Sequence, residues 1–125
     1  MKPILFTLLL SLSATFASAQ KQIYAFACAE DFSDSVVYIT SIRPLPAGAK
    51  LTRGFLEHRM QWSNQFENYI ERTFPVSNAT ATIFYSKSKK KIAKQLEKVK
   101  KTIDKEFNKT INVVKDNEFV FTPIQ

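Results

Sequence analysis

Side chains that commonly carry acid–base or nucleophilic chemistry are scarce in this sequence. It has one histidine, His58, and one cysteine, Cys28, whereas such catalysis needs a base beside a nucleophile or two tuned carboxylates. A zinc site would need several of these residues at set spacing. The two glycines, Gly48 and Gly54, cannot build a glycine-rich phosphate loop. We therefore predict a non-enzymatic protein with no cofactor and no metal site.

Three carboxylates, those of Glu30, Asp31 and Asp34, fall in one short polar stretch. Such oxygens are suitable ligands for Ca²⁺, but their spacing does not match the repeated Asp/Asn pattern of a calcium loop. Solvated acids of a turn are the simpler interpretation. A small hydrolase, or an inhibitor of one, would require a cleft that brings His58 and Arg59 close to these acids.

Arg59 has an unusual position in a predicted helix over residues 52–73. Its helical phase places it within the apolar face, between Phe55, Trp62 and Phe66, and His58 falls at the edge of that face. An arginine in such a place extends toward solvent, stacks on an aromatic ring or meets a carboxylate. A structural role is the simpler interpretation. If the protein holds an anionic ligand in a groove, Arg59 is the candidate residue.

Positive charge is concentrated in residues 87–107, which have the pattern of a long amphipathic helix. The chain has a formal net charge of +7, and this segment holds nine lysines against three acids. Seven of the lysines share one face and place an ammonium group at about every turn over roughly 27 Å. These are Lys87, Lys90, Lys91, Lys94, Lys98, Lys101 and Lys105.

The opposite face of this helix is an apolar stripe, which predicts packing against a sheet. Its members are Ile92, Leu96, Val99, Ile103 and Phe107. Two interpretations of the lysine face remain. It contacts an anionic polymer or surface of the cell envelope, or it serves only solubility while the protein acts as a structural or adaptor domain. The adaptor would recognise a protein through a sheet edge or an aromatic surface near the last predicted hairpin. The face has no interleaved aromatic or arginine side chains, which argues against nucleic acid as the partner.

The remaining elements follow from apolar alternation and turn residues. We predict strands at 22–29, 36–42, 78–85, 110–114 and 118–121, and a helix at 52–73 with Thr52 as its N-cap. The first two strands should be antiparallel neighbours, and residues 43–48 a connector. The last two should form a hairpin or one bulged strand. The order β-β-α-β-α-β predicts an α+β fold. We expect a two-layer sandwich in which two helices pack on one face of a mixed or antiparallel sheet of four or five strands.

The first residues have the order of a secretory signal peptide. Lys2 precedes an apolar run over residues 4–12 and small residues that end at Ala19. The run is shorter than the ~20 residues that span a membrane. We therefore expect a signal peptide at 1–19, one α+β domain at 20–125, and export to the periplasm or the medium after cleavage near Ala19. The mature chain should have no membrane span. Its single cysteine allows no internal disulfide.

Two stretches of the chain carry a resemblance. The run DSVVYIT at residues 34–40 and the strand-to-helix junction IFYSKSKKK at residues 83–91 follow the export signal. With them, the sequence resembles small, uncharacterised secreted proteins of Gram-negative gut anaerobes. The resemblance implies export and a small domain, and it brings no established activity with it.

Overall fold

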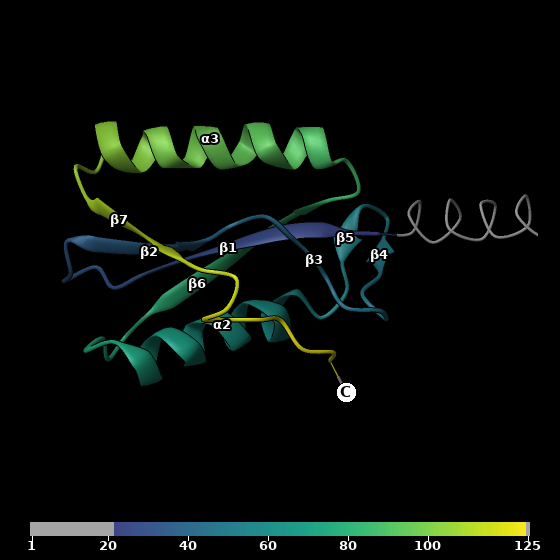
Figure 1. Cartoon of the computed structure of the whole chain (residues 1–125), viewed down its shortest axis with the longest axis horizontal. Helices are drawn as coiled ribbons and strands as arrows, with labels where there is room; N and C mark the ends of the chain where they lie inside the picture. Colours follow the sequence, from purple (N-terminus) through teal and green to yellow (C-terminus); the bar gives the residue numbers. More distant parts are fainter. Residues whose placement is uncertain (1–21, 125) are drawn as a thin grey trace, which may run out of the picture.

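The computed structural model describes residues 22–124, in which two helices enclose a sheet (Figure 1). The predicted signal peptide, 1–19, lies outside the described residues. The elements in chain order are β1 (Tyr24–Glu30), β2 (Val36–Thr40), β3 (Arg43–Pro44), β4 (Leu51–Thr52), β5 (Phe55–Leu56), α2 (Arg59–Thr73), β6 (Thr80–Ser86), α3 (Lys89–Lys105) and β7 (Thr110–Val114). Neither helix in this part of the chain is long and apolar enough to cross a membrane.

The main sheet is mixed and is built around β1. Strand β6 pairs antiparallel along one edge of β1, and β2 and β3 pair antiparallel along the other. Strand β7 pairs in parallel with the far side of β2. The predicted α+β class, the antiparallel neighbours β1 and β2, and the mixed sheet are confirmed. The short pair β4–β5 forms a separate hairpin.

The helices cover opposite faces of the sheet, whereas we predicted both on one face (Figure 1). Alternate residues of β1 point to the two sides. Ala25, Ala27 and Ala29 belong to the core beneath α2, and Phe26 belongs to the core beneath α3. Because both faces of β1 are apolar, each needs its own cover. The small alanine side chains leave room for the large side chains of α2.

A one-residue bulge separates β2 from β3. Cys28 pairs with Ile39, but Ala25 pairs with Arg43, so the β2–β3 side has one extra residue. At this point the Thr40 hydroxyl oxygen accepts a backbone N–H of β1 at 2.9 Å. The bulge turns the Arg43 side chain toward α2. Residues Arg43–Pro44, predicted as connector, are therefore a short strand at which proline is tolerated.

Helix α2 begins later than predicted, because a hairpin takes the place of its first turns. Arg53 and Gly54 adopt left-handed dihedral angles, with φ of 54° and 83°, as in a two-residue hairpin turn. His58 is also left-handed, with φ of 58°, and α2 starts at Arg59 without a side-chain cap. Thr52 therefore caps no helix. The predicted end near Thr73 is confirmed.

The apolar face of α2 is confirmed in its middle and is wrong at its start. Trp62, Phe66 and Ile70 are buried. Phe55 belongs to β5 and is exposed, and Met60 in the first turn is 71% exposed. The predicted helix was too long at its start, because it was extended through the residues of the hairpin.

The C-terminal segment is not the predicted strand. After β7 the chain turns and crosses to the α2 side, where Phe119 and Phe121 are buried against the aromatic side chains of α2. Gln65 holds this segment, since its amide accepts the N–H of Thr122 and donates to its carbonyl oxygen, both at 2.8 Å. The expected last hairpin and its aromatic surface are therefore wrong, because these rings are in the core.

Helix α3 agrees closely with its prediction. Ser88 is the N-cap, and its hydroxyl oxygen accepts the Lys91 N–H at 3.2 Å. Ile92, Leu96 and Ile103 are buried. Phe107 lies beyond the end of the helix and is 60% exposed, so its predicted place in the buried stripe is wrong.

Candidate functional site

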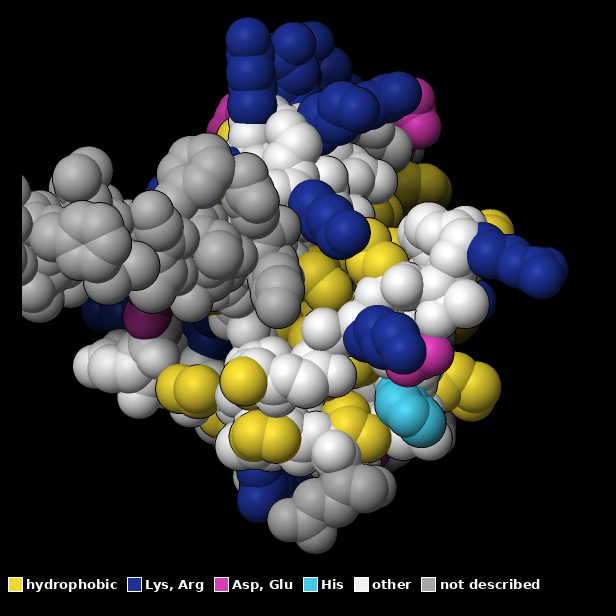
Figure 2. Space-filling view, turned by 90° about the vertical axis from the view of Figure 1, so that its right-hand side faces the viewer, with side chains coloured by type: hydrophobic (Ala, Val, Ile, Leu, Met, Phe, Trp, Pro, Cys, Tyr) yellow, Lys and Arg dark blue, Asp and Glu magenta, His cyan; other side chains and the backbone are white. Residues whose placement is uncertain are grey.

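The outer face of α3 carries the predicted lysine row. Ile92 and Leu96 share a core with Phe26 and Ile39 of the sheet, which directs the lysines away from the protein. The seven predicted lysines are all exposed. Figure 2 shows Lys and Arg side chains gathered at the top of the molecule, on the α3 side. The sequence thus predicted both the buried apolar face and the exposed lysine face of α3.

The charges of this row are not neutralised by ion pairs. Within residues 22–124, the ion pairs join Arg43 with Asp116 and Lys109 with Glu30, and no lysine of α3 takes part. Glu97 is the one acid in the middle of the helix. The lysine face therefore presents a net positive charge to solvent, interrupted in the middle by Glu97.

A shallow hollow of about 540 Å³ lies along this face. Its lining combines four lysines with one acid and two small side chains: Lys90, Ala93, Lys94, Glu97, Lys98, Lys101 and Thr102. Flexible lysine stems form its sides. Such a surface can attract an extended anion through its positive charge. Its flexible side chains do not fix hydrogen-bond donors in the geometry that would select one particular anionic group.

Arg59 is not within an apolar face, as predicted, but is exposed at the start of α2. It does line a groove, of about 530 Å³, between α2 and β6. The other lining residues are Met60, Ser63, Asn64, Glu67, Thr80, Ala81, Thr82 and Ile83. His58, predicted at the edge of that face, is exposed and precedes the helix. Both changes follow from the late start of the helix.

The groove borders a sheet edge that side chains of α2 partly cap. Glu67 accepts the N–H of Ala81, and Glu71 accepts the N–H of Ala79, each at 3.2 Å. In an antiparallel edge strand the N–H and C=O groups of alternate residues point away from the neighbouring strand. Like those of Ala79 and Ala81, the N–H of Ile83 therefore points away from β1. The capping shortens the length of edge that another strand can join.

The three turn acids do not form a metal site. Glu30 pairs with Lys109 at 3.1 Å, and Asp31 accepts both the N–H and the hydroxyl of Ser33. These bonds from Ser33 lower the pKa of the exposed Asp31 carboxyl. No group of three potential metal ligands occurs in the described part of the chain. The Glu30 side chain lies on the α3 face of the sheet and His58 precedes α2 on the other, so the cleft that a hydrolase would require is not formed.

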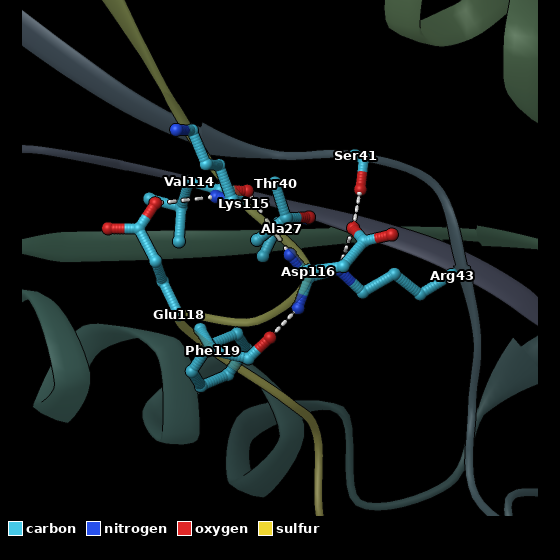
Figure 3. Close-up of polar contacts among 9 residues, drawn as sticks. All are labelled: Ala27, Thr40, Ser41, Arg43, Val114, Lys115, Asp116, Glu118 and Phe119. Atoms are coloured by element: carbon cyan, nitrogen blue, oxygen red, sulfur yellow. Dashed lines mark hydrogen bonds and ion pairs between the residues drawn. The ribbon is translucent and has the colours of Figure 1, made fainter.

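Arg43 is a buried charged residue that sequence reasoning missed (Figure 3). One terminal nitrogen of its guanidinium, Nη1, donates to the Phe119 carbonyl oxygen, and the other, Nη2, donates to that of Val114 at 3.1 Å. Nε lies 3.4 Å from the Asp116 carboxylate, which also accepts the Ser41 hydroxyl. Burial lowers the pKa of Arg43, and Asp116 opposes that shift. These contacts of the Arg43 guanidinium hold the C-terminal segment in place. No sequence motif around Arg43 predicts them.

Comparison with known proteins identifies no relative: no family model, no curated protein and no solved structure matches the chain.

Proposed function

We propose that this chain is a non-enzymatic binding domain that holds an anionic polymer or surface against the lysine face of α3. The observation that carries the proposal is the row of exposed lysines without ion pairs. Like charges three and four residues apart cost a few tenths of a kcal/mol per pair. A face that served solubility alone could interleave both signs and avoid this cost.

The chemistry of the row favours recognition of charge density. Lysine is a hydrated point charge on a flexible stem, and it lacks the fork with which arginine binds a phosphate or carboxylate in two places. Ammonium groups about one helical turn apart match an extended anion or an anionic lipid surface. We therefore expect broad selectivity for carboxylate, sulfate or phosphate groups.

The proposed compartment is the cell envelope or the medium. Support comes from the order of charged, apolar and small residues at 1–19. Envelope polymers and lipid headgroups supply anions there. The intact mass of the protein recovered from outside the cytoplasm should correspond to a chain that begins at Gln20, whereas recovery of the full-length chain from the cytoplasm alone would contradict export.

The binding proposal is tested with a variant in which Lys91, Lys94, Lys98 and Lys101 are changed to Gln. Its matched control changes Lys50, Arg53, Arg72 and Lys115, which are exposed basic residues outside α3. The probes are dextran sulfate and phosphatidylglycerol vesicles. At about 50 mM salt, where exposed charges are weakly screened, both proteins can be compared with the native chain.

The first variant should lose most of its affinity. Each lysine near an anionic surface contributes about 1 kcal/mol, so four removals should weaken binding by two to three orders of magnitude, or roughly 3–4 kcal/mol. The control should lose far less. Equal losses in both variants, or no binding of either probe by the native chain, would contradict the proposal. Binding of dextran sulfate would indicate an anionic polymer as the partner, and binding of the vesicles would indicate an anionic lipid surface.

A second candidate function is that of an adaptor for a protein partner, and the groove beside β6 favours it. Arg59 and the exposed Met60 stand at this groove, next to a sheet edge whose capping by Glu67 and Glu71 leaves part of its backbone open. A peptide that joined this edge would bind through backbone hydrogen bonds and apolar contact. The affinity for such a peptide should change little with salt and should be retained in the variant with four α3 lysines changed to Gln. Met60→Asp should abolish the binding.

A further inference from the structure

A second concave surface lies where α3 meets the sheet, and it is open to solvent on one side. It is a slot of about 340 Å³ at the C-terminal half of the helix. It is lined by Cys28, Gln95, Lys98, Val99, Thr102, Ile103 and Phe107. Its volume is at the lower end of the range of roughly 300–1,000 Å³ that small-molecule sites occupy.

The slot exists because, next to Cys28, α3 covers the residue of one neighbouring strand and not that of the other. Cys28 points toward α3, and its neighbours across the sheet are Ile39 on β2 and Thr82 on β6. Ile39 is fully buried, whereas Thr82 is exposed. Beside Cys28 the helix therefore covers Ile39 and leaves Thr82 open to solvent. Phe107, just after the helix, stands at one end of this opening with its ring largely in solvent.

The floor of the slot is apolar and uncharged. Val99 and Ile103 contribute aliphatic side chains, and Cys28 contributes a thiol that is half-buried. Burial, with the nearby Glu30 carboxylate, raises the pKa of this thiol from 9.0 to about 12. At neutral pH the thiol is protonated and behaves as a small apolar group.

The two ends of the slot differ in charge. Lys98 lies on its outer rim, and within the described residues its ammonium group has no ion-pair partner. Gln95 adds an amide to the same lining. The Glu30 carboxylate lies near Cys28 and is occupied by Lys109 at 3.1 Å. An anionic group is therefore attracted to the unpaired Lys98 ammonium group at the rim, while the Glu30–Lys109 pair near Cys28 offers no free positive charge.

We propose that this slot binds a single-chain anionic amphiphile of the fatty carboxylate class, with its carboxylate at Lys98 and its alkyl chain over Cys28 and Ile103. The proposal goes beyond the binding of a polymer or surface, because the ligand is a monomer held between α3 and the sheet. The slot and the hollow on the lysine face share Lys98 and Thr102 in their linings. A carboxylate on a chain satisfies both the charged rim and the apolar floor, which neither a polyanion nor an uncharged alkane does.

Laurate below its micelle concentration tests the proposal, with the alkylation of Cys28 by iodoacetamide at alkaline pH as the measurement. Cys28 is the only cysteine, so the label reports on the slot alone. Laurate at ten times its Kd should slow alkylation about tenfold, since only the empty fraction reacts. Dodecyltrimethylammonium has a chain of the same length and the opposite charge, and it should protect far less.

Variants assign the two ends of the ligand. Lys98→Gln should weaken laurate binding about tenfold, as expected for loss of one charged hydrogen bond, while Lys94→Gln, on the same helix but outside the slot, should not change it. Phe107→Ala should also weaken binding, and it should leave the fold intact because the ring is 60% exposed.

The proposal is overturned if laurate leaves the alkylation rate unchanged, if the cationic amphiphile protects Cys28 equally, or if Lys98→Gln and Lys94→Gln behave alike. Binding of dextran sulfate, measured separately on the same proteins, reports on the lysine face. Failure of one site is thereby distinguished from failure of the other.

Discussion

Arg43 joins parts of the chain that are more than seventy residues apart in sequence. Its guanidinium donates to the carbonyl oxygens of Val114, at the end of β7, and of Phe119 in the C-terminal segment, and stands 5.7 Å from the centre of the Phe119 ring. A buried charge is costly unless it is hydrogen-bonded, and these acceptors supply that compensation. The bulge after β2 directs the Arg43 side chain toward these carbonyl oxygens. A local irregularity of the sheet thereby determines a contact between residues that are distant in sequence.

Arg43→Met should destabilise the protein by about 2–4 kcal/mol, because it leaves two buried carbonyl oxygens without donors. Urea unfolding followed by circular dichroism measures the change. Asp116→Asn is the matched control. The Asp116 side chain is 78% exposed, so loss of this ion pair should cost under about 1 kcal/mol. Equal losses in the two variants would show that Arg43 contributes no more than a surface charge.

The Cys28 thiol should make the protein sensitive to alkaline pH. Its pKa is raised to about 12 in the folded chain, against 9.0 in the unfolded chain. The stability that this group contributes is complete below pH 9 and is lost as pH rises toward about 12, because the unfolded chain releases the proton first. Cys28→Ala should therefore lose less stability than the native chain between these limits, in denaturant unfolding at a series of pH values. Identical pH profiles of the two proteins would contradict the burial of the thiol.

At the scale of elements, α3 shows how a single periodicity encodes two faces. Its apolar stripe recurs at helical spacing and fixes the helix onto the sheet, and this alone places the lysines in solvent. A buried face is costly to change, whereas the lysine face can be altered without touching the core. This separation makes the outer face open to experiment.

The variant with Lys91, Lys94, Lys98 and Lys101 changed to Gln should fold at least as stably as the native chain. Removing like charges at spacings of three and four residues relieves repulsion worth a few tenths of a kcal/mol per pair, so a gain of up to about 1 kcal/mol is expected. Thermal unfolding at low salt measures it, and the gain should shrink as salt rises. A loss of stability larger than this would mean that the lysine stems support the fold, and loss of binding would then need another explanation.

The hairpin β4–β5 depends on one glycine. Gly54 has φ of 83°, and a Cβ there would meet open space, so the cost of a side chain is backbone strain alone. Gly54→Ala should destabilise the protein by about 1 kcal/mol, and Gly54→Asn, which tolerates left-handed angles, should cost less. Chemical denaturation of the two variants gives the comparison. If alanine and asparagine are equivalent, the left-handed turn is not present in solution.

Local pattern was enough to predict some elements and not others. Apolar spacing predicted α3 within residues 87–107, and the helix spans Lys89–Lys105, so that Phe107 lies outside it. The start of α2 was missed because a helical phase can be drawn through residues 52–58, although Arg53-Gly54 is the two-residue turn of a hairpin. The parallel pairing of β7 with β2 depends on contacts between distant segments, which no local pattern reports.

At the scale of the whole molecule, one sheet separates two different surfaces. The α2 side buries aromatic residues of the helix and the C-terminal segment, and the α3 side carries the lysine face. The placement of one helix on each side could have been inferred from β1 and β2, since both are apolar on both faces.

The candidate site was predictable where it is continuous in sequence. The lysine row lies within one helix, so its residues could be named in advance. The groove at Arg59 and the slot at Cys28 combine a helix with a strand, and their linings emerge only after the elements are packed. The exposed ring of Phe107 could not be foreseen, because the helix ends two residues earlier.

The central claim, that the lysine face of α3 binds an anionic partner, is tested most directly by NMR. Soluble dextran sulfate is added to the isotopically labelled protein, and the shift of each backbone amide is followed. We expect chemical-shift changes concentrated at Lys90, Lys94, Lys98 and Lys101, reversed by salt, with little change on the α2 side. Shifts centred on the groove beside β6, or none at a concentration that saturates other basic helices, would contradict it.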